Sequence, residues 1–479
     1  MINSEELVRE LATGLPEGAV RNQRIESLLY AHDASDFVGR VGAVCFPEST
    51  EDVQHIVKTC VRHGVPFVAR GSGTGLAGGA TPLDGAVVIV LTRMNRILEI
   101  DPVNRLAWVE PGVLNLDVSH RVHDSDERFG LHFAPDPSSQ QSCTVGGNVA
   151  NNSGGPHCLA DGVTSAHVLA CDVVLSDGSI ARLGSEESEG NGLDLRGAFV
   201  GSEGMFGIAT RVCLRLMQNP PAVRTMLLDF TSVREGADTV SAIIAAGVVP
   251  AALEMMDRLC LQAVEAYIGA GLPIDAAAVL LVEVTGLRHQ VDHEADLVAR
   301  IGRDHGARTI RVAQDEAERA LLWKGRKTAF GAIARIKPNY YLHDTVVPRR
   351  ALPTVLDQVY EIARRHDLLV LNVFHAGDGN LHPLLVFDRR EPGVLDRVHA
   401  AGEEIVRASV AAGGVLSGEH GIGLEKRDFM PLLFTDDDLW AQVALRDAFD
   451  PTGLANPGKV VPSPAGCGDL QHVPQGAWI

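Results

Sequence analysis

The segment 49–64 carries apolar residues at helical spacing. Its apolar positions are Val53, Ile56, Val57, Cys60 and Val61. Positions three or four residues apart fall on one face of a helix, so the segment predicts an amphipathic helix. Ser49-Thr50-Glu51-Asp52 resembles a capping box at its start, and Gly64 is a typical residue to end it.

Short apolar runs, bounded by glycine, proline or polar residues, alternate with further helical patterns. We expect strands at 65–69, 86–91, 173–176, 208–216 and 279–284, and helices at 352–365 and 398–411. Asn219-Pro220-Pro221 interrupts the pattern, and we expect a domain boundary there. Both halves mix helices and strands, so the sequence predicts an α+β fold with two domains.

Length and charge limit the classes of function. At 479 residues the chain exceeds one compact core, and 46% hydrophobic with 22% charged residues is ordinary for a globular protein. The net charge of −19 is spread along the chain and disfavours nucleic acid or an anionic membrane as a partner. An anionic substrate would therefore need a local cationic site.

We expect neither a targeting segment nor a membrane span from the sequence. Residues 1–20 lack a basic start followed by an apolar run, and no stretch approaches the ~20 apolar residues of a membrane span. We therefore expect a cytoplasmic protein with no direct membrane span. The cysteines form no Cys-x-x-Cys pair, which predicts reduced, mainly buried thiols. They are Cys45, Cys60, Cys143, Cys158, Cys171, Cys213, Cys260 and Cys467.

Glycine-rich stretches are the main candidates for a cofactor site. The stretch 73–78 has the G-x-G-x-x-G pattern, but Pro82 and a strand follow where a Rossmann site requires a helix. Such a loop can still turn its backbone N–H groups inward to bind an anion, with a tight turn between strands as the alternative. Similar stretches at 135–155 and 201–207 favour a long ligand, and a dinucleotide fits better than a mononucleotide.

The segment 372–384 combines a turn signal with two histidines. Asp378-Gly379 is typical of a two-residue hairpin turn between apolar runs. If these residues form the turn, His375 lies opposite His382, and both imidazoles share one face with Cβ atoms ~4.5–5.5 Å apart. From there both can bind one ion, and two surface histidines beside a turn are the alternative.

A second glycine-rich loop, 413–423, adds a carboxylate and a third imidazole. Glu419 would complete a metal site of two histidines and one carboxylate, with positions left for substrate oxygen, and zinc, manganese and iron all accept this set. His420 remains as a general base, because a neutral imidazole accepts a hydroxyl proton at neutral pH. A helix-capping Glu419 and a hydrogen-bonded core His420 are the alternatives.

The segments 47–53, 70–79, 135–155 and 201–207 together resemble the FAD-binding domain of the vanillyl-alcohol oxidase type. The resemblance implies two α+β subdomains that clasp FAD, an α+β (ferredoxin-like) cap domain, and a C-terminal segment that returns to the FAD domain. FAD is expected to be non-covalent, since loop 70–79 has neither His nor Cys, and His157 and Cys158 nearby are expected to be structural. The implied FAD contacts are Pro47, Arg70, Gly71, Ser72, Gly73, Thr74, Gly75, Leu76, Gly78, Gly79, Pro135, Asp136, Ser138, Thr144, Gly146, Gly147, Asn148, Asn151, Ser153, Gly154, Gly155, Gly162, Gly204, Gly207, Ile208 and Asn456.

The expected domain order follows from these motifs. It is an N-terminal helical segment at 1–38, the FAD-binding domain at 39–219, the cap domain at 220–415, a C-terminal segment at 416–462 that completes the active site and the FAD site, and a tail at 463–479.

The histidine motifs, with Trp323-Lys324-Gly325-Arg326 and the stretches 335–341, 347–350 and 449–459, resemble the D-lactate dehydrogenase and glycolate oxidase (large flavin subunit) branch. This resemblance implies oxidation of a small D-2-hydroxy acid, such as glycolate or D-lactate, to the 2-oxo acid. It makes His375, His382 and Glu419 ligands of one divalent metal, His420 the base and Arg326 the anchor of the substrate carboxylate. A guanidinium also suits this role by its bidentate geometry, and an exposed helix arginine is the alternative.

Relatives that act on 2-hydroxyglutarate need polar residues for a second carboxylate, whereas Leu342 and Leu384 are apolar here. A short or apolar substrate is therefore favoured, and a 2-hydroxyglutarate-type dehydrogenase is an alternative.

Reduced flavin must pass its electrons to an external acceptor, because the sequence shows neither a nicotinamide site nor iron–sulfur cysteines. The resemblance implies a second flavin-type subunit and an iron–sulfur subunit that lead to a quinone, with peripheral attachment at the inner membrane through these partners. A stand-alone enzyme is the alternative. A non-catalytic electron-transfer flavoprotein and a flavin-free metallohydrolase are two further classes, and the second does not explain the glycine stretches.

Overall fold

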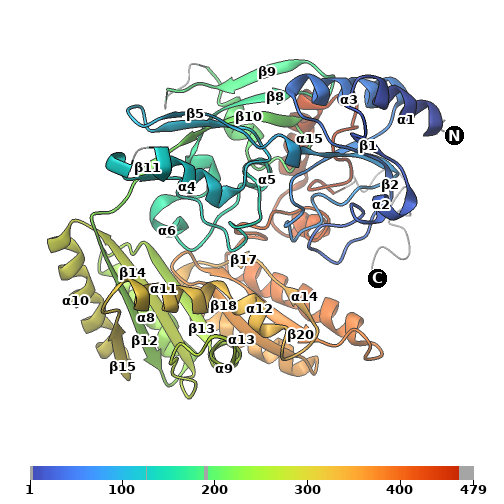
Figure 1. Ribbon diagram of the computed structural model, residues 1–479. Helices are drawn as coiled ribbons and strands as arrows, with labels where there is room; N and C mark the ends of the chain where they lie inside the picture. The colour runs from blue at the N-terminus through green and yellow to red at the C-terminus, as the bar shows by residue number, and fades with distance from the viewer. Residues whose placement is uncertain (1–3, 126, 188–191, 463–479) are drawn as a thin grey trace. The chain divides into compact units, whose positions relative to one another are not determined.

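The computed structural model describes residues 4–125, 127–187 and 192–462, so the predicted tail at 463–479 and the thiol of Cys467 lie outside the described residues. The chain divides into two compact units (Figure 1). Unit 1 comprises Met1–Gly154, Gly162–Asn219 and Glu419–Ile479, and unit 2 comprises Gly155–Asp161 and Pro220–Gly418. The C-terminal segment therefore returns to the unit that contains the glycine-rich loops.

The first described sheet of unit 1 has the strand order β1-β2-β4-β3. Its strands are β1 (Val20–Arg21), β2 (Val41–Cys45), β3 (Phe67–Arg70) and β4 (Ala86–Val90). Strands β2, β4 and β3 are parallel, and β1 is antiparallel to β2. Every residue of β4 is buried, which explains its continuous apolar sequence, because parallel strands are covered on both faces.

Helix α3 (Thr50–His63) confirms the helix predicted from the apolar spacing. The Ser49 hydroxyl accepts from the Asp52 N–H, and Gly64 ends the helix with the left-handed φ of 61°. The apolar face of α3 joins a core that also holds Leu7 and Leu11 of helix α1 (Ser4–Thr13), which lies beside α3 in Figure 1. A short helix α2 (Arg24–Leu28) precedes β2.

A second, antiparallel sheet of unit 1 has the described order β5-β6-β10-β8-β9, and β7 pairs with β11 apart from it. The strands are β5 (Ile97–Asp101), β6 (Leu106–Val109), β7 (Leu131–His132), β8 (Val168–Val174), β9 (Ile180–Gly184), β10 (Ile208–Arg215) and β11 (Met217–Gln218). The other helices of the unit are α4 (Asn115–Ser125), α5 (Val145–Asn151), α7 (Leu195–Phe199), α15 (Asp436–Phe449) and the 3-10 turns at 91–93, 127–129, 164–166 and 427–432.

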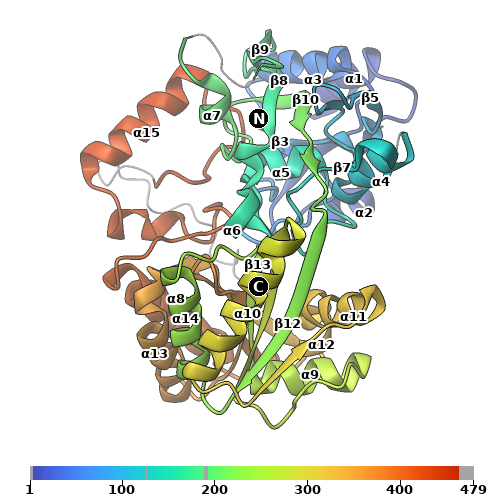
Figure 2. The ribbon, with the colours of Figure 1, turned by 90° about the vertical axis from the view of Figure 1, so that its left-hand side faces the viewer.

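Unit 2 is built on one large sheet (Figure 2). Nine strands of this sheet are described. The path is β15-β12-β14-β13-β18-β19-β17, and β18 also pairs with β20, which pairs with β16. The strands are β12 (Ala222–Phe230), β13 (Ala252–Asp257), β14 (Ala278–Gly286), β15 (Thr309–Val312), β16 (Asn339–Leu342), β17 (Thr345–Val346), β18 (Leu369–His375), β19 (Asn380–Leu381) and β20 (Pro383–Phe387). All the described pairings of this sheet are antiparallel.

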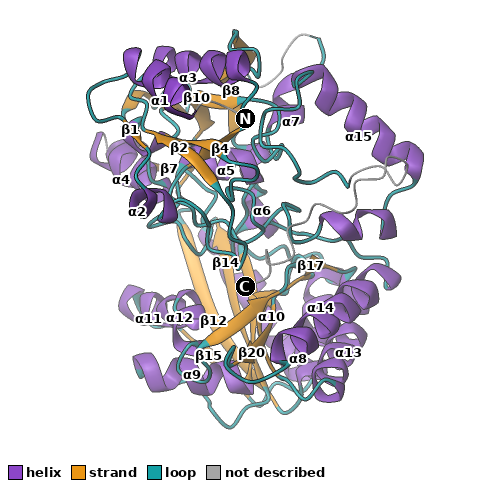
Figure 3. Ribbon diagram, turned by 90° about the vertical axis from the view of Figure 1, so that its right-hand side faces the viewer, coloured by secondary structure: helices purple, strands orange, loops and turns teal. Residues whose placement is uncertain are grey.

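Helices cover both faces of this sheet (Figures 2 and 3). One face carries α8 (Val233–Ala245), α10 (Arg288–Asp304), α13 (Leu352–Arg365) and α14 (Val394–Ala411), and the other carries α9 (Arg258–Ile268), α11 (Glu316–Lys327) and α12 (Ala329–Ile333). A short α6 (Cys158–Asp161) and a 3-10 turn at 349–351 complete the unit. Helix α13 has the predicted bounds, and the two units together confirm the α+β class.

The register predicted for the hairpin is wrong. His375 pairs with Asn380 rather than His382, and residues 376–379 form the turn, in which Gly379 has φ 73°. The pairing is displaced by two residues, so side-chain parity is kept, since strands alternate with period two. His382 therefore still lies on the same face as His375, as its diagonal neighbour, and the ring centroids are 5.2 Å apart.

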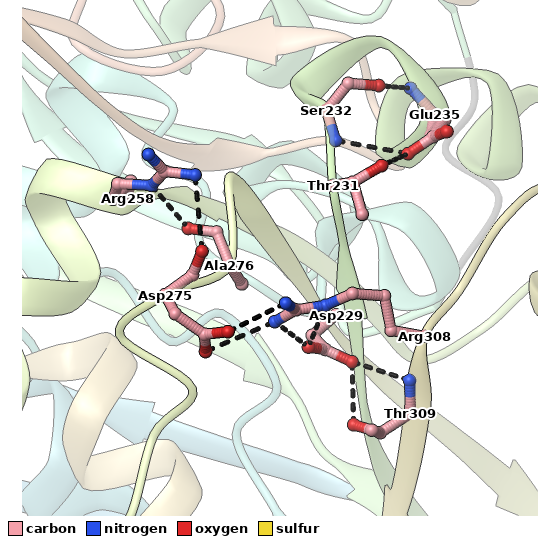
Figure 4. A network of polar contacts seen from close by, with 9 residues as sticks. All are labelled: Asp229, Thr231, Ser232, Glu235, Arg258, Asp275, Ala276, Arg308 and Thr309. Carbon is pink, nitrogen blue, oxygen red and sulfur yellow. Dashed lines mark hydrogen bonds and ion pairs between the residues drawn. The ribbon is translucent and has the colours of Figure 1, made fainter.

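A polar network fastens β12 to the chain around it (Figure 4). The buried Asp229 carboxylate accepts from the Arg308 guanidinium and from the backbone N–H (2.7 Å) and hydroxyl (2.6 Å) of Thr309. Arg308 also binds Asp275, at 2.8 Å. Next to it, Ser232 and Glu235 form a reciprocal capping box at the start of α8.

We predict that Arg308→Ala lowers the free energy of unfolding by about 2–3 kcal/mol, because it leaves the Asp229 charge buried with only Thr309 as a donor. Calorimetry should show this as a lower Tm. Arg364→Ala is the matched control, because Arg364 pairs with Glu361 at the surface and should contribute less than about 1 kcal/mol. Equal Tm values for the two variants would contradict the prediction.

Candidate active site

The loop after β3 leaves a row of backbone donors unused. Among the described residues, no backbone N–H from Gly71 to Gly79 donates a hydrogen bond within the protein. Backbone N–H groups normally find a partner, so a run of them indicates a place for an external acceptor such as phosphate. The connection to β4 covers residues 71–85, so it is not the tight turn considered as the alternative.

Some glycines of this loop are needed for protein packing, and others leave open space. A Cβ on Gly71 would lie 2.1 Å from the Thr144 hydroxyl, and Gly73 has φ 75° with the Arg70 guanidinium 2.0 Å from such a Cβ. A Cβ on Gly75 or Gly79, in contrast, would have no protein atom closer than 3.6 Å. A ligand can therefore approach the backbone at these two positions, which fits the pyrophosphate of FAD.

The returning C-terminal segment is fixed next to this loop inside unit 1. The Asn456 amide donates to the carbonyls of Gly79 and Glu203, at 2.8 and 2.7 Å. The Glu203 carboxylate in turn accepts from the N–H groups of Ile422 and Gly423, at 2.7 and 2.8 Å. Of the predicted FAD contacts, Asn456 thus holds the loop in place through its hydrogen bond to Gly79. Another predicted contact, Asn151, donates to the His420 carbonyl at 3.1 Å.

Burial raises the pKa of Glu203 to about 7, although the N–H groups of Ile422 and Gly423 and the charges of Lys459 and Lys426 oppose the rise. Burial also lowers the pKa of Lys459 to about 8. Both groups therefore titrate much nearer to neutral pH than they would in an unfolded chain.

In unit 2, Glu254 connects two of the predicted site residues. It lies on β13 directly opposite His375 of β18, and its carboxylate accepts from His375 Nδ1 at 2.8 Å. The same carboxylate accepts from Arg326 Nε of α11 at 2.6 Å. Burial alone would raise the pKa of Glu254, but the charges of His375 and Arg326 and their hydrogen bonds lower it below its ordinary value.

Arg326 is an unusual arginine. Its side chain is 1% exposed, so it is not the exposed helix arginine considered as the alternative. Only Nε is hydrogen bonded, and both terminal nitrogens are buried without a partner. Two unsatisfied, parallel donors in the interior cost free energy, and they match the two oxygens of a carboxylate.

The predicted metal ligands come together. Single ligand atoms of His375, His382 and Glu419 lie within 4.8 Å of one another. His375 and His382 are 3% and 1% exposed, so they are not the surface histidines of the alternative. Glu419 directly follows Gly418, the last residue of unit 2. Two imidazoles and one carboxylate at this spacing fit a divalent cation such as zinc, manganese or iron.

Asp344 is a further residue of this region. It accepts from the Gly418 N–H at 3.1 Å and from the Ser417 hydroxyl at 2.5 Å, and thereby fixes the chain just before Glu419. It also forms a second possible metal group with His382 and His420. Sequence reasoning does not single out Asp344 or Glu254. The only signal for Glu254 is one carboxylate in an otherwise apolar run, and its partners depend on strand register.

Comparisons with known proteins identify the family of the chain. Residues 41–184 match the family described as FAD binding domain, and residues 219–460 match the one described as FAD linked oxidases, C-terminal domain. The chain belongs to the FAD-linked oxidase family. These matches confirm FAD as the predicted cofactor of this oxidase.

Relatives of this FAD-linked oxidase align along most of its length. The glycolate oxidase subunit GlcD of Escherichia coli (strain K12) is 46% identical, over 90% of this chain and 86% of that protein. The subunit of the same name from Bacillus subtilis (strain 168) is 39% identical, over 90% and 92%. A D-lactate dehydrogenase of Anaerostipes hadrus is 30% identical, over 90% and 92%.

Solved structures support the predicted fold. The 4-ethylphenol oxidase of Gulosibacter chungangensis has a TM-score of 0.80 at 21% identity and covers 95% of this chain and 97% of its own. The p-cresol methylhydroxylase structure has a TM-score of 0.80 at 17% identity, with 95% and 96% covered. The vanillyl-alcohol oxidase type of fold is thereby confirmed.

All the described cysteines are free thiols, and all of them except Cys158 are buried, as predicted. Neither of the possible metal groups found among the described residues includes a cysteine. Within the described residues, no helix combines the length and apolar character that a membrane crossing needs.

We predict that Gly75→Val yields a folded protein without FAD. The new side chain meets no protein atom closer than 3.8 Å at its Cβ and needs no positive φ, but it fills the space beside the unused N–H groups. Gly331→Val is the matched control, because a Cβ there meets no atom within 4 Å. Flavin absorbance at about 450 nm should be lost in the first variant and kept in the second. A yellow Gly75→Val protein would contradict the assignment of this loop.

We predict that Glu203 makes stability depend on pH. Its folded pKa of about 7 exceeds the ordinary 4.5, so the stabilisation by its proton is complete below pH 4.5 and is lost as pH rises through 7. The free energy of unfolding should fall by about 2–3 kcal/mol between pH 5 and 7.5. Urea titrations of wild type and Glu203→Gln test this, and an equally steep pH dependence in Glu203→Gln would contradict it.

Proposed function

We propose that this FAD-linked oxidase oxidises a small D-2-hydroxy acid, such as glycolate or D-lactate, to the 2-oxo acid, with FAD and one bound divalent cation. One observation carries the proposal. Arg326, whose two terminal nitrogens have no partner, and the candidate cation ligand His375 both donate a hydrogen bond to the same carboxylate, Glu254. A guanidinium that can bind an anion and an imidazole that can bind a cation thus lie side by side on one carboxylate. A 2-hydroxy acid, with its carboxylate next to a hydroxyl, suits such a pair.

The names of the relatives support the substrate class, since two of them are glycolate oxidase subunits and one is a D-lactate dehydrogenase. The predicted preference for a short or apolar substrate has support in unit 2. Leu342 and Leu384 are opposite each other on β16 and β20, and both are buried. Neither can serve a second carboxylate.

The roles of the residues follow from their chemistry. Arg326 binds the substrate carboxylate through its two terminal nitrogens. His375, His382 and Glu419 hold the cation, and His420 accepts the proton of the 2-hydroxyl at a ring nitrogen. When bound, FAD supplies the acceptor for the hydride from C2, and the cation supplies positive charge that makes the hydroxyl more acidic. Burial of Arg326 strengthens its attraction for the carboxylate, because little water competes.

The electrons then leave for an acceptor outside this chain. The word subunit in the names of two relatives supports a multi-subunit enzyme. We propose a second flavin-type subunit and an iron–sulfur subunit that lead to a quinone, with peripheral membrane attachment through these partners. A cytoplasmic location of the chain itself belongs to the same proposal.

His420→Ala should keep FAD and the cation but lose reduction by substrate by about 10²–10⁴-fold, because the hydroxyl proton then has no positioned acceptor. The measurement is anaerobic mixing with D- and L-2-hydroxy acids while flavin bleaching is followed. His289→Ala is the control, since His289 lies exposed on α10.

Three outcomes would contradict the proposal or a part of it. Bleaching of His420→Ala at the wild-type rate would remove His420 from the role of base. Failure of the wild-type protein to bleach with any hydroxy acid would favour a non-catalytic electron-transfer flavoprotein. Bleaching by 2-hydroxyglutarate alone would favour that substrate type instead.

A further inference from the structure

Two buried carboxylates lie on the same face of the unit 2 sheet, and each meets an arginine of α11. Glu254 is on β13, and Glu283 is on β14 opposite Ala252, two residues before Glu254. Both carboxylates are 1% exposed. Arg319 and Arg326 are seven residues apart, so they project from the same side of the helix toward this face.

In the Glu283 pair the arginine is bonded to the carboxylate through two of its nitrogens, and we call this pair closed. Arg319 donates to Glu283 through Nε and through one terminal nitrogen, both at 2.9 Å, and Trp323 and Thr225 donate to the same carboxylate. This is the two-bond geometry that an arginine prefers with a carboxylate. Such a pair satisfies both partners and needs no ligand, so its role is to join α11 to β14.

In the Glu254 pair the arginine is bonded to the carboxylate through one nitrogen only, and we call this pair open. Arg326 uses only Nε, and its buried terminal nitrogens have no partner. The interaction through Nε holds the guanidinium against Glu254 while its two terminal nitrogens make no hydrogen bond to this carboxylate. The end of the guanidinium is thus held as a two-donor receptor, and Glu254 determines where that receptor points.

Glu254 also determines which nitrogen of His375 can bind a cation. An ionised carboxylate only accepts hydrogen bonds, so His375 Nδ1 must carry the proton that it donates to Glu254 at 2.8 Å. The lone pair of the neutral ring is then on Nε2, and the hydrogen bond fixes the orientation of the ring. Since Glu254 and His375 are opposite each other in the strand register, this bond is built into the sheet.

We propose that Glu254 is a positioning residue that orients the substrate anchor Arg326 and the cation ligand His375 together, a proposal that rests on the proposed function. It touches neither the substrate nor the cation. Its single carboxylate fixes the angle between the carboxylate receptor and the cation, and a 2-hydroxy acid has to bridge the two. Loss of Glu254 should therefore weaken cation binding and substrate binding in the same variant.

The test compares Glu254→Gln with Glu283→Gln in the FAD-loaded full chain. Zn²⁺ affinity is measured on metal-stripped protein by competition with a chromophoric chelator, and KM and kcat are measured with glycolate and D-lactate. Glu254→Gln should weaken Zn²⁺ binding by ~10–100-fold and raise KM by a similar factor. Glu283→Gln should reduce Tm but change neither Zn²⁺ affinity nor KM by more than about threefold, because its arginine pair is closed.

A second variant keeps the proposal testable if Glu254→Gln does not fold. Glu254→Asp keeps the charge but shortens the side chain, so both hydrogen bonds lengthen, and the same two measurements should change in the same direction by a smaller factor. Wild-type values of Zn²⁺ affinity and KM in either Glu254 variant would overturn the proposal, as would equal losses in Glu283→Gln. If the wild-type protein neither binds Zn²⁺ nor bleaches with a hydroxy acid, the proposed function itself fails, and the proposal is overturned with it.

Discussion

A buried carboxylate must have charged or polar partners, and this constraint organises the candidate site. Glu254 is 1% exposed, and an isolated charge there would cost several kcal/mol. Its partners are Arg326 and His375, so the stability of the sheet and the geometry of the site depend on the same three side chains. Movement of one of them would leave the other two with an unmatched charge, which makes the arrangement rigid before any ligand binds.

The sequence predicts the elements of this fold better than their pairing. The apolar spacing of α3 and α13 gives both helices almost residue by residue, because each has a continuous buried face. The Asp378-Gly379 signal also marks a real turn, but the turn takes four residues, and the register moves by two. His375 and His382 still meet, since a shift of two preserves the face to which a side chain points. A shift of one would have separated them.

The residues that sequence reasoning leaves out are those whose role is set by distant pairing. Glu254 is one acidic residue in an apolar strand, and nothing near it in the sequence indicates that His375 will lie opposite. Asp344 likewise acts through Ser417 and Gly418, more than seventy residues later. In contrast, Arg326 and the histidines stand in recognisable motifs. Local patterns therefore reveal groups that would contact a ligand, whereas the groups that hold them depend on the assembled sheet.

The two unpartnered terminal nitrogens of Arg326 affect the stability of the protein. Unsatisfied buried donors cost roughly 1–3 kcal/mol each, so the protein without an anion is less stable than its packing would allow. A carboxylate that binds to Arg326 satisfies these donors and removes this cost. The free energy that is regained in this way contributes to the binding of the carboxylate. The chain carries a net charge of −19, which repels anions at long range. Recognition of an anionic substrate must then come from a short-range, desolvated site. The unpartnered terminal nitrogens of Arg326, in contrast to the paired guanidinium of Arg319, are the place that we propose for it.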